Sequence, residues 1–123
     1  MSNARAANYA FYYTLKLKTI DALIVNENCV WSNTFHSASS LANITIEGII
    51  GQDINFQWSP LSAASLNSII THLSDTAENK TVTLNLSAVN TAFETSLGAA
   101  DGSTSSEWLA LTATKPNWTF SLV

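Results

Sequence analysis

The feature that most constrains the fold is a pattern of large apolar residues that occurs twice with the same internal spacing. In each copy an aromatic residue is followed six positions later by a leucine, and an isoleucine comes three positions after that leucine. A shift of 24 residues superimposes three pairs of positions, which are Phe11/Phe35, Leu17/Leu41 and Ile20/Ile44. A fixed period of this size predicts stacked coils, each packing its apolar side chains against those of the next. We therefore expect Ile20 and Ile44 to occupy adjacent positions in the stack.

Most of the remaining apolar residues alternate with polar ones, which is typical of half-buried strands. This alternation predicts strands at 23–25, 44–46, 54–58, 82–86 and 118–122. Helices are expected between the later strands. Apolar residues at helical spacing predict an amphipathic helix over 63–74, with Ser62 as its N-cap. Ser87 is the expected cap of a second helix, and Thr104 begins a capping box for a third helix that ends before Pro116.

The order of these elements predicts an α/β fold, built as a short leucine-rich solenoid with stacked short parallel strands. A strand–helix–strand–helix–strand unit is expected to close its C-terminal end. The length of 123 residues predicts a single domain over 1–123. Within it we expect a tag-like or disordered arm at 1–8, repeats over 9–60, and helical and strand repeats with a cap over 61–123.

The composition argues against two classes of partner. The net charge is -4, and the five basic residues do not cluster, so binding to a nucleic-acid backbone is not expected. No apolar run approaches the roughly 18 residues that a membrane span requires.

Charged residues make up only 11% of the chain, so Ser, Thr and Asn must supply most of the polar surface. Cys29 is the single cysteine, and we interpret it as a small buried apolar residue.

No catalytic residue, metal site or cofactor is predicted, and the chain is not expected to be an enzyme. His36 and His72 are the only histidines, and neither has a second ligand at metal-binding spacing. The sequence lacks a nucleophile elbow and a glycine-rich phosphate loop. Asp75 and Glu78 are interpreted as solvated charge. The oxygen-rich segment 101–107 is better explained by helix capping than by calcium binding.

The binding candidates are Tyr9, Tyr12 and Tyr13, since tyrosine is enriched at protein interfaces. The four tryptophans are instead expected mainly in the core, because three of them fall on the apolar phase of their element. No polar cap is recognisable at the N-terminal end of the stack. That edge is therefore expected to mediate contacts between copies of the chain in a homo-oligomer.

The segments that carry the 24-residue pattern, 11–20 and 35–46, resemble BspA-like leucine-rich repeats. The segments 44–48, 54–56, 59–61 and 117–120 are similar to a version common in phage and prophage proteins of gut bacteria, some of them tail components. The resemblance extends from about residue 9 to the end, although Thr14 and Ala38 stand where the family often has a cysteine.

This resemblance implies a non-enzymatic binding or structural module, associated with a phage tail or a bacterial surface. It implies adhesion through a rigid polar surface, a host-surface protein or glycan as partner, and a virion or cell-surface location. Two alternatives are a purely architectural spacer and a small hydrolase acting on glycans or the cell wall. The hydrolase would need two carboxylates facing each other across a groove.

Overall fold

The computed structural model describes residues 16–31, 34–93 and 106–123, which form short strands and three helices. In chain order these elements are β1 (Thr19–Val25), β2 (Asn43–Gly48), β3 (Ile54–Phe56), α1 (Ala63–Thr71), β4 (Lys80–Leu84), α2 (Leu86–Phe93), α3 (Ser106–Ala113) and β5 (Trp118–Leu122). Every pairing between named strands is parallel. The predicted α/β class with short parallel strands is therefore confirmed.

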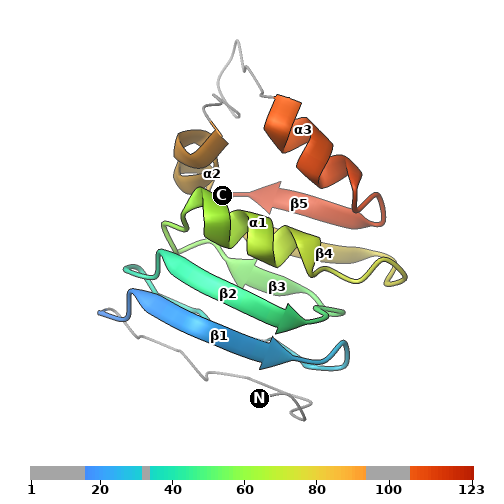
Figure 1. The fold of residues 1–123 in the computed structure, drawn as a ribbon, viewed down its shortest axis with the longest axis horizontal. Coiled ribbons are helices and arrows are strands. Elements are labelled where there is room, and N and C mark those ends of the chain that lie inside the picture. The colour runs from blue at the N-terminus through green and yellow to red at the C-terminus, as the bar shows by residue number, and fades with distance from the viewer. Residues whose placement is uncertain (1–15, 32–33, 94–105) are drawn as a thin grey trace.

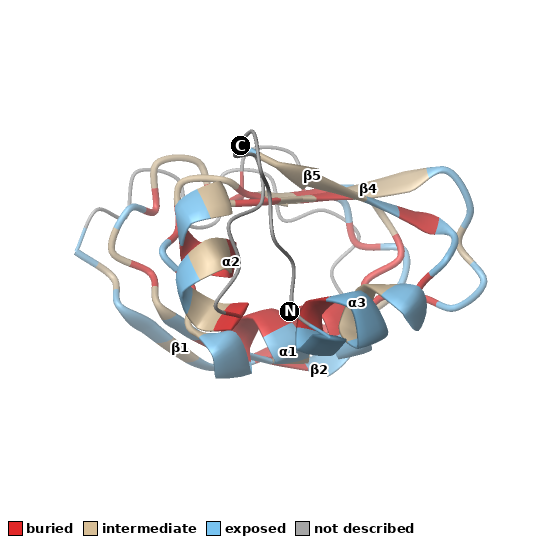
Figure 2. Ribbon diagram, turned by 90° about the horizontal axis from the view of Figure 1, so that it is seen from above, coloured by how far each residue is buried: buried red, intermediate tan, exposed pale blue. Residues whose placement is uncertain are grey.

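The strands belong to two sheets that lie on opposite sides of the core. One sheet contains β1 and β2, and the other has the order β3–β4–β5. In Figure 1, β1, β2 and α1 follow one another in a front layer, and β3 and β4 lie behind them. Figure 2 shows β4 and β5 facing the layer of β1, β2 and α1, with buried residues in both layers. The chain thus passes repeatedly from one layer to the other.

The front sheet places the isoleucines that end the two copies of the apolar pattern side by side. Ile20 is the partner of Ile44, as the 24-residue spacing predicts, and Leu23 is the partner of Ile46. The register shifts between Ile20 and Leu23, because β1 carries one more residue there than β2. Both residues of the second pair are buried in the core, so the two strands share one apolar face.

The end of β2 requires a glycine. Gly48 has a φ of 102°, which is a conformation that residues with a side chain rarely adopt. A Cβ atom at this position would lie 2.0 Å from the backbone oxygen of Val25. The absence of a side chain therefore lets β2 end directly against β1.

The helix α1 follows the predicted apolar stripe and begins where the sequence indicates. Ser62 is its N-cap, with its side chain accepting a hydrogen bond from the backbone N–H of Ser65. The helix ends at Thr71, earlier than the predicted 63–74. The chain then becomes extended, and Leu73 forms a parallel bridge with Ile50.

α1 also takes the place of a third strand beside β2. Ser65 Oγ accepts a hydrogen bond from the N–H of Ile44, and Ser68 Oγ accepts one from the N–H of Ile46, both at 2.9 Å. Ser65 Oγ donates in turn to the carbonyl oxygen of Ala42 at 2.9 Å. The helix thereby satisfies backbone groups that a neighbouring strand would otherwise have to pair.

Three further local predictions are wrong. The strand predicted at 82–86 ends at Leu84, and Leu86 begins α2. The cap of α2 is Asn85 rather than Ser87, because Asn85 Oδ1 accepts the N–H of Ala88 at 2.9 Å. Trp58 was expected to complete the strand 54–58, but β3 ends at Phe56 and Trp58 is half-buried beyond it. Thr104 and the arm 1–8 lie outside the described residues.

The interior between the layers contains the expected aromatic residues. The rings of Phe35 and Phe56 stack with their centroids 4.4 Å apart. Trp31, Trp108 and Trp118 are each at most 6% exposed, so these tryptophans are core residues as predicted. Cys29 is buried and forms no disulfide, and burial raises the pKa of its thiol.

Candidate functional site

A groove with a volume of about 540 Å³ lies on the second sheet, where β3 and β4 meet the segment that contains Val30 and Trp31. Its lining combines amide, carboxylate and hydroxyl groups with a few apolar side chains. The lining residues are Val30, Trp31, Gln52, Asp53, Ile54, Asn55, Thr81 and Thr83. The volume falls within the range of ordinary small-molecule sites, which is roughly 300–1,000 Å³.

The alternation of the strands explains why polar groups line this groove. Val82 and Leu84 of β4 are fully buried, so the intervening Thr83 is turned away from the core. The parallel register then places Asn55 of β3 beside Thr83 and Ser121 of β5 on its other side. A second row contains Thr81 and its β5 partner, Thr119. The outer face of the sheet is therefore an ordered array of small polar side chains.

Each long polar side chain of the groove is held by at least one hydrogen bond. Asp53 Oδ1 accepts the backbone N–H of Thr81 at 2.7 Å, and Gln52 Oε1 accepts a bond from Lys80 Nζ at 3.0 Å. Asn55 is bound twice to the residue two positions further along, through its Oδ1 at 2.8 Å and its Nδ2 at 3.0 Å. These bonds fix the orientation of the side chains before any ligand arrives.

Several groups of the groove have no hydrogen-bond partner among the residues that the structure describes. They are the second carboxylate oxygen of Asp53, the amide nitrogen of Gln52, and the hydroxyls of Thr81 and Thr83. Trp31 lies in the wall of the groove. It is 3% exposed, and its Nε1 is buried without a partner in the described part of the chain. The site therefore combines fixed side chains with unused donors and acceptors.

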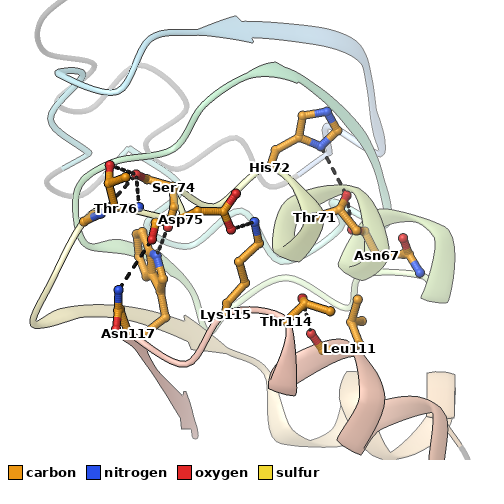
Figure 3. A network of polar contacts seen from close by, with 12 residues as sticks. Asn67, Thr71, His72, Ser74, Asp75, Thr76, Leu111, Thr114, Lys115 and Asn117 are labelled. Carbon is orange, nitrogen blue, oxygen red and sulfur yellow. Dashed lines mark hydrogen bonds and ion pairs between the residues drawn. The ribbon is translucent and has the colours of Figure 1, made fainter.

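A second polar cluster joins the loop after α1 to the loop between α3 and β5 (Figure 3). Lys115 Nζ lies 2.7 Å from Asp75 Oδ1, across 40 positions of sequence. Trp118 Nε1 donates to the carbonyl oxygen of Ser74 at 2.9 Å, and Asn117 Nδ2 donates to that of Asp75 at 3.4 Å. Asp75 is 78% exposed, as expected of a solvated charge, and it also pairs with a largely buried lysine. These contacts anchor the C-terminal strand.

The residues singled out in the sequence do not form a chemical site. His36 packs its ring against Trp58 at 4.2 Å, and His72 ends α1 with its Nδ1 2.6 Å from the carbonyl oxygen of Ser68. Within the described ranges no group of three or more His, Cys, Asp or Glu residues could hold a metal ion. Every acidic residue in those same ranges is exposed. Tyr9, Tyr12 and Tyr13, the predicted binding candidates, lie outside the described residues.

The groove residues were missed because their signal is weak in the sequence. Asp53 and Asn55 stand on the polar phase of one strand pattern, and Thr81 and Thr83 stand 28 positions later on the polar phase of another. The offset of 28 residues relates only β3 to β4 and is not repeated between the other paired strands. A single offset does not reveal from the sequence that these positions are neighbours. Polar residues at such positions are also ordinary for any strand with one face toward water.

None of the helices in the described ranges is long and apolar enough to cross a membrane. Comparisons of the chain with models of protein families, with curated proteins and with solved structures found no match. The function is therefore argued from the geometry of the groove and of the polar sheet face.

Proposed function

We propose that the chain is a short leucine-rich solenoid that acts as a non-enzymatic binding module. Its binding surface is the outer face of the sheet β3–β4–β5, which displays polar side chains to a partner on a cell or virion surface. The observation that carries this proposal is the continuous parallel register that aligns Asn55, Thr83 and Ser121. The pairing of Ile20 with Ile44 at the 24-residue spacing supports the solenoid.

The mechanism is display from a rigid support. Adjacent strands lie about 4.8 Å apart, so aligned side chains repeat at that distance across the sheet. Because the backbone is fixed by its ladder hydrogen bonds and the groove side chains by their own bonds, little conformational entropy is lost on binding. The resemblance to repeats of phage tails and bacterial surfaces makes a host-surface protein or glycan the favoured partner class.

The hydrolase alternative gains no support from the site. Hydrolysis of a glycosidic bond ordinarily uses two carboxyl groups on either side of the scissile bond. The described lining of the groove contains a single carboxylate, that of Asp53. The spacer alternative differs from the proposal in requiring no binding to this face, so a binding measurement separates the two.

Binding to cells tests the proposal. Fluorescently labelled protein is mixed with gut bacterial cells of several species, and bound protein is measured by flow cytometry at concentrations up to about 10 µM. We expect saturable binding to at least one species. The variant Thr83→Tyr with Ser121→Tyr, which crowds the polar face, should bind much less. Thr45→Tyr, at an exposed position of β2, should bind normally.

Two results would contradict the proposal. One is the absence of saturable binding to every species. The other is equal binding by both variants and the unmodified chain, because the partner would then contact some other surface.

A further inference from the structure

We infer that the groove binds a neutral linear glycan whose chain crosses β3 and β4 in the direction of β5. This inference rests on the proposed binding function and adds the chemical class and orientation of the ligand. It is carried by the unused hydrogen-bonding groups of the groove, by its charge, and by the spacing of its rows.

The hydrogen-bonding groups match those of a sugar. A sugar hydroxyl both donates and accepts, so it pairs equally well with a carboxylate oxygen, an amide nitrogen or another hydroxyl. The unused groups comprise one acceptor, the second oxygen of Asp53, and one donor, the amide nitrogen of Gln52. The hydroxyls of Thr81 and Thr83 serve in either sense. A pyranose ring presents neighbouring hydroxyls that can engage several of these groups together.

The apolar part of the lining suits the C–H faces of a sugar ring. Val30 is 41% exposed beside the groove and offers this apolar contact. Ile54 and Trp31 also line the groove, but they are only 2% and 3% exposed and therefore form its floor and wall. The groove thus offers apolar contact next to unsatisfied polar groups.

The charge of the groove favours a neutral ligand. Asp53 is the only ionisable residue in the described lining, and the chain as a whole has a net charge of -4. The nearby Lys80 donates to the neutral amide of Gln52 and keeps its own charge, so the described groups at the groove carry one negative and one positive charge. This balance gives no net attraction to an anion or to a cation. Neutral hydroxyls can donate to the carboxylate, which accepts from them strongly.

The arrangement of the rows gives the direction of the chain. Asn55, Thr83 and Ser121 succeed one another on neighbouring strands, and Thr81 and Thr119 form a parallel row. The step from strand to strand is about 4.8 Å. This step is close to the length that one pyranose unit adds to an extended 1,4-linked chain. Successive sugars that run across the strands therefore meet the polar side chains of one strand after another.

Isothermal titration calorimetry with defined oligosaccharides tests this inference. The probes are neutral hexasaccharides of β-1,4-glucose, β-1,4-mannose, β-1,4-N-acetylglucosamine and β-1,3-glucose, with an α-1,4-galacturonate hexamer as the anionic comparison. We expect at least one neutral probe to bind, to remain intact on prolonged incubation, and to bind at least tenfold more tightly than the galacturonate.

Matched variants locate the binding. Thr83→Val removes one hydroxyl from the groove and should raise the Kd about tenfold, which corresponds to about 1.4 kcal/mol. Asp53→Asn should weaken binding at least as much. Thr45→Val makes the same change as the first variant at an exposed position of β2, and its Kd should equal that of the unmodified chain. Thermal unfolding of each variant verifies that it is folded.

Three outcomes would overturn the inference: no neutral probe binds, the galacturonate binds best, or Thr83→Val and Thr45→Val have the same affinity. If cells are still bound through the sheet face in any of these cases, the proposed function survives and only the ligand class is wrong. If neither cells nor oligosaccharides are bound, both proposals fail.

Discussion

The ion pair of Lys115 and Asp75 joins a buried side chain to an exposed one, so removing either residue should change the stability by a different amount. The lysine side chain is 8% exposed, whereas that of Asp75 is 78% exposed. Asp75→Ala leaves a buried ammonium without its carboxylate, so we expect the free energy of unfolding to fall by about 1–3 kcal/mol. Lys115→Met removes the buried charge and leaves a carboxylate already in water, so we expect a change within about 1 kcal/mol. Urea denaturation of both variants measures the difference.

The contrast between the two variants is the informative quantity. Equal losses of stability would mean that the lysine finds other partners or water when Asp75 is removed. Asp21→Ala, at an exposed position of β1, provides a comparison for the loss of a carboxylate alone.

Cys29 predicts a dependence of stability on alkaline pH. Burial raises the pKa of its thiol above the ordinary value of 9.0, so the folded chain keeps this proton at a pH where the unfolded chain releases it. The resulting stabilisation is complete below pH about 9 and is lost as the pH rises toward the folded-state pKa. The stability difference between the unmodified chain and Cys29→Ala should therefore shrink by up to about 1.4 kcal/mol per pH unit in this window.

Urea denaturation of the unmodified chain and of Cys29→Ala from pH 7 to 10.5 measures this difference in stability. The effects of tyrosine and lysine titration are common to both chains, so they cancel in the difference. A difference that is constant or grows with pH would contradict the account of the Cys29 thiol.

Among the elements, α1 has a role that its apolar stripe alone does not reveal. Ser65 is 3% exposed, and its Oγ bonds both the N–H of Ile44 and the carbonyl oxygen of Ala42. Ser65→Ala should lower the free energy of unfolding by about 1–2 kcal/mol, because the buried N–H of Ile44 loses its partner, while the carbonyl oxygen of Ala42 keeps its bond from the N–H of Ser62. Ser68→Ala, which removes one bond, should cost about 1 kcal/mol. Asn67→Ala, on the exposed side of the same helix, should have no comparable effect.

Hydrogen exchange distinguishes this role from general destabilisation. Protection of the Ile44 amide should fall more than that of Ile54 in the Ser65→Ala variant. A uniform loss of protection across both sheets would show that α1 does not specifically pair the edge of β2.

The elements also show what the sequence can predict. Alternation and helical spacing depend on neighbours in the chain, so the strands around 44–46 and 118–122 and the start of α1 at Ser62 were predictable. The pairing of Asp75 with Lys115 and the bonds from Ser65 to β2 were not, because they join residues many positions apart. The same holds for the groove, whose lining depends on how β3 and β4 align. Asn85 was overlooked as a cap because Ser87 is an equally good capping residue.

At the scale of the whole molecule, the alignment of successive parallel strands underlies the core, the polar face and the groove. Thr19 of β1 and Asn43 of β2 are Cα partners, and both are exposed. Neighbouring strands about 4.8 Å apart satisfy the geometry of a disulfide, whereas positions two residues out of register, about 8 Å apart, do not. Cysteine pairs introduced at such positions can therefore report the register directly.

The most direct test uses mild oxidation in a Cys29→Ala background, with mass spectrometry to quantify the disulfide. The account predicts that Thr19→Cys with Asn43→Cys oxidises nearly completely, while Thr19→Cys with Thr45→Cys remains largely reduced. Preferential oxidation of the second pair, or equally little oxidation of both, would contradict the strand register from which the rest follows.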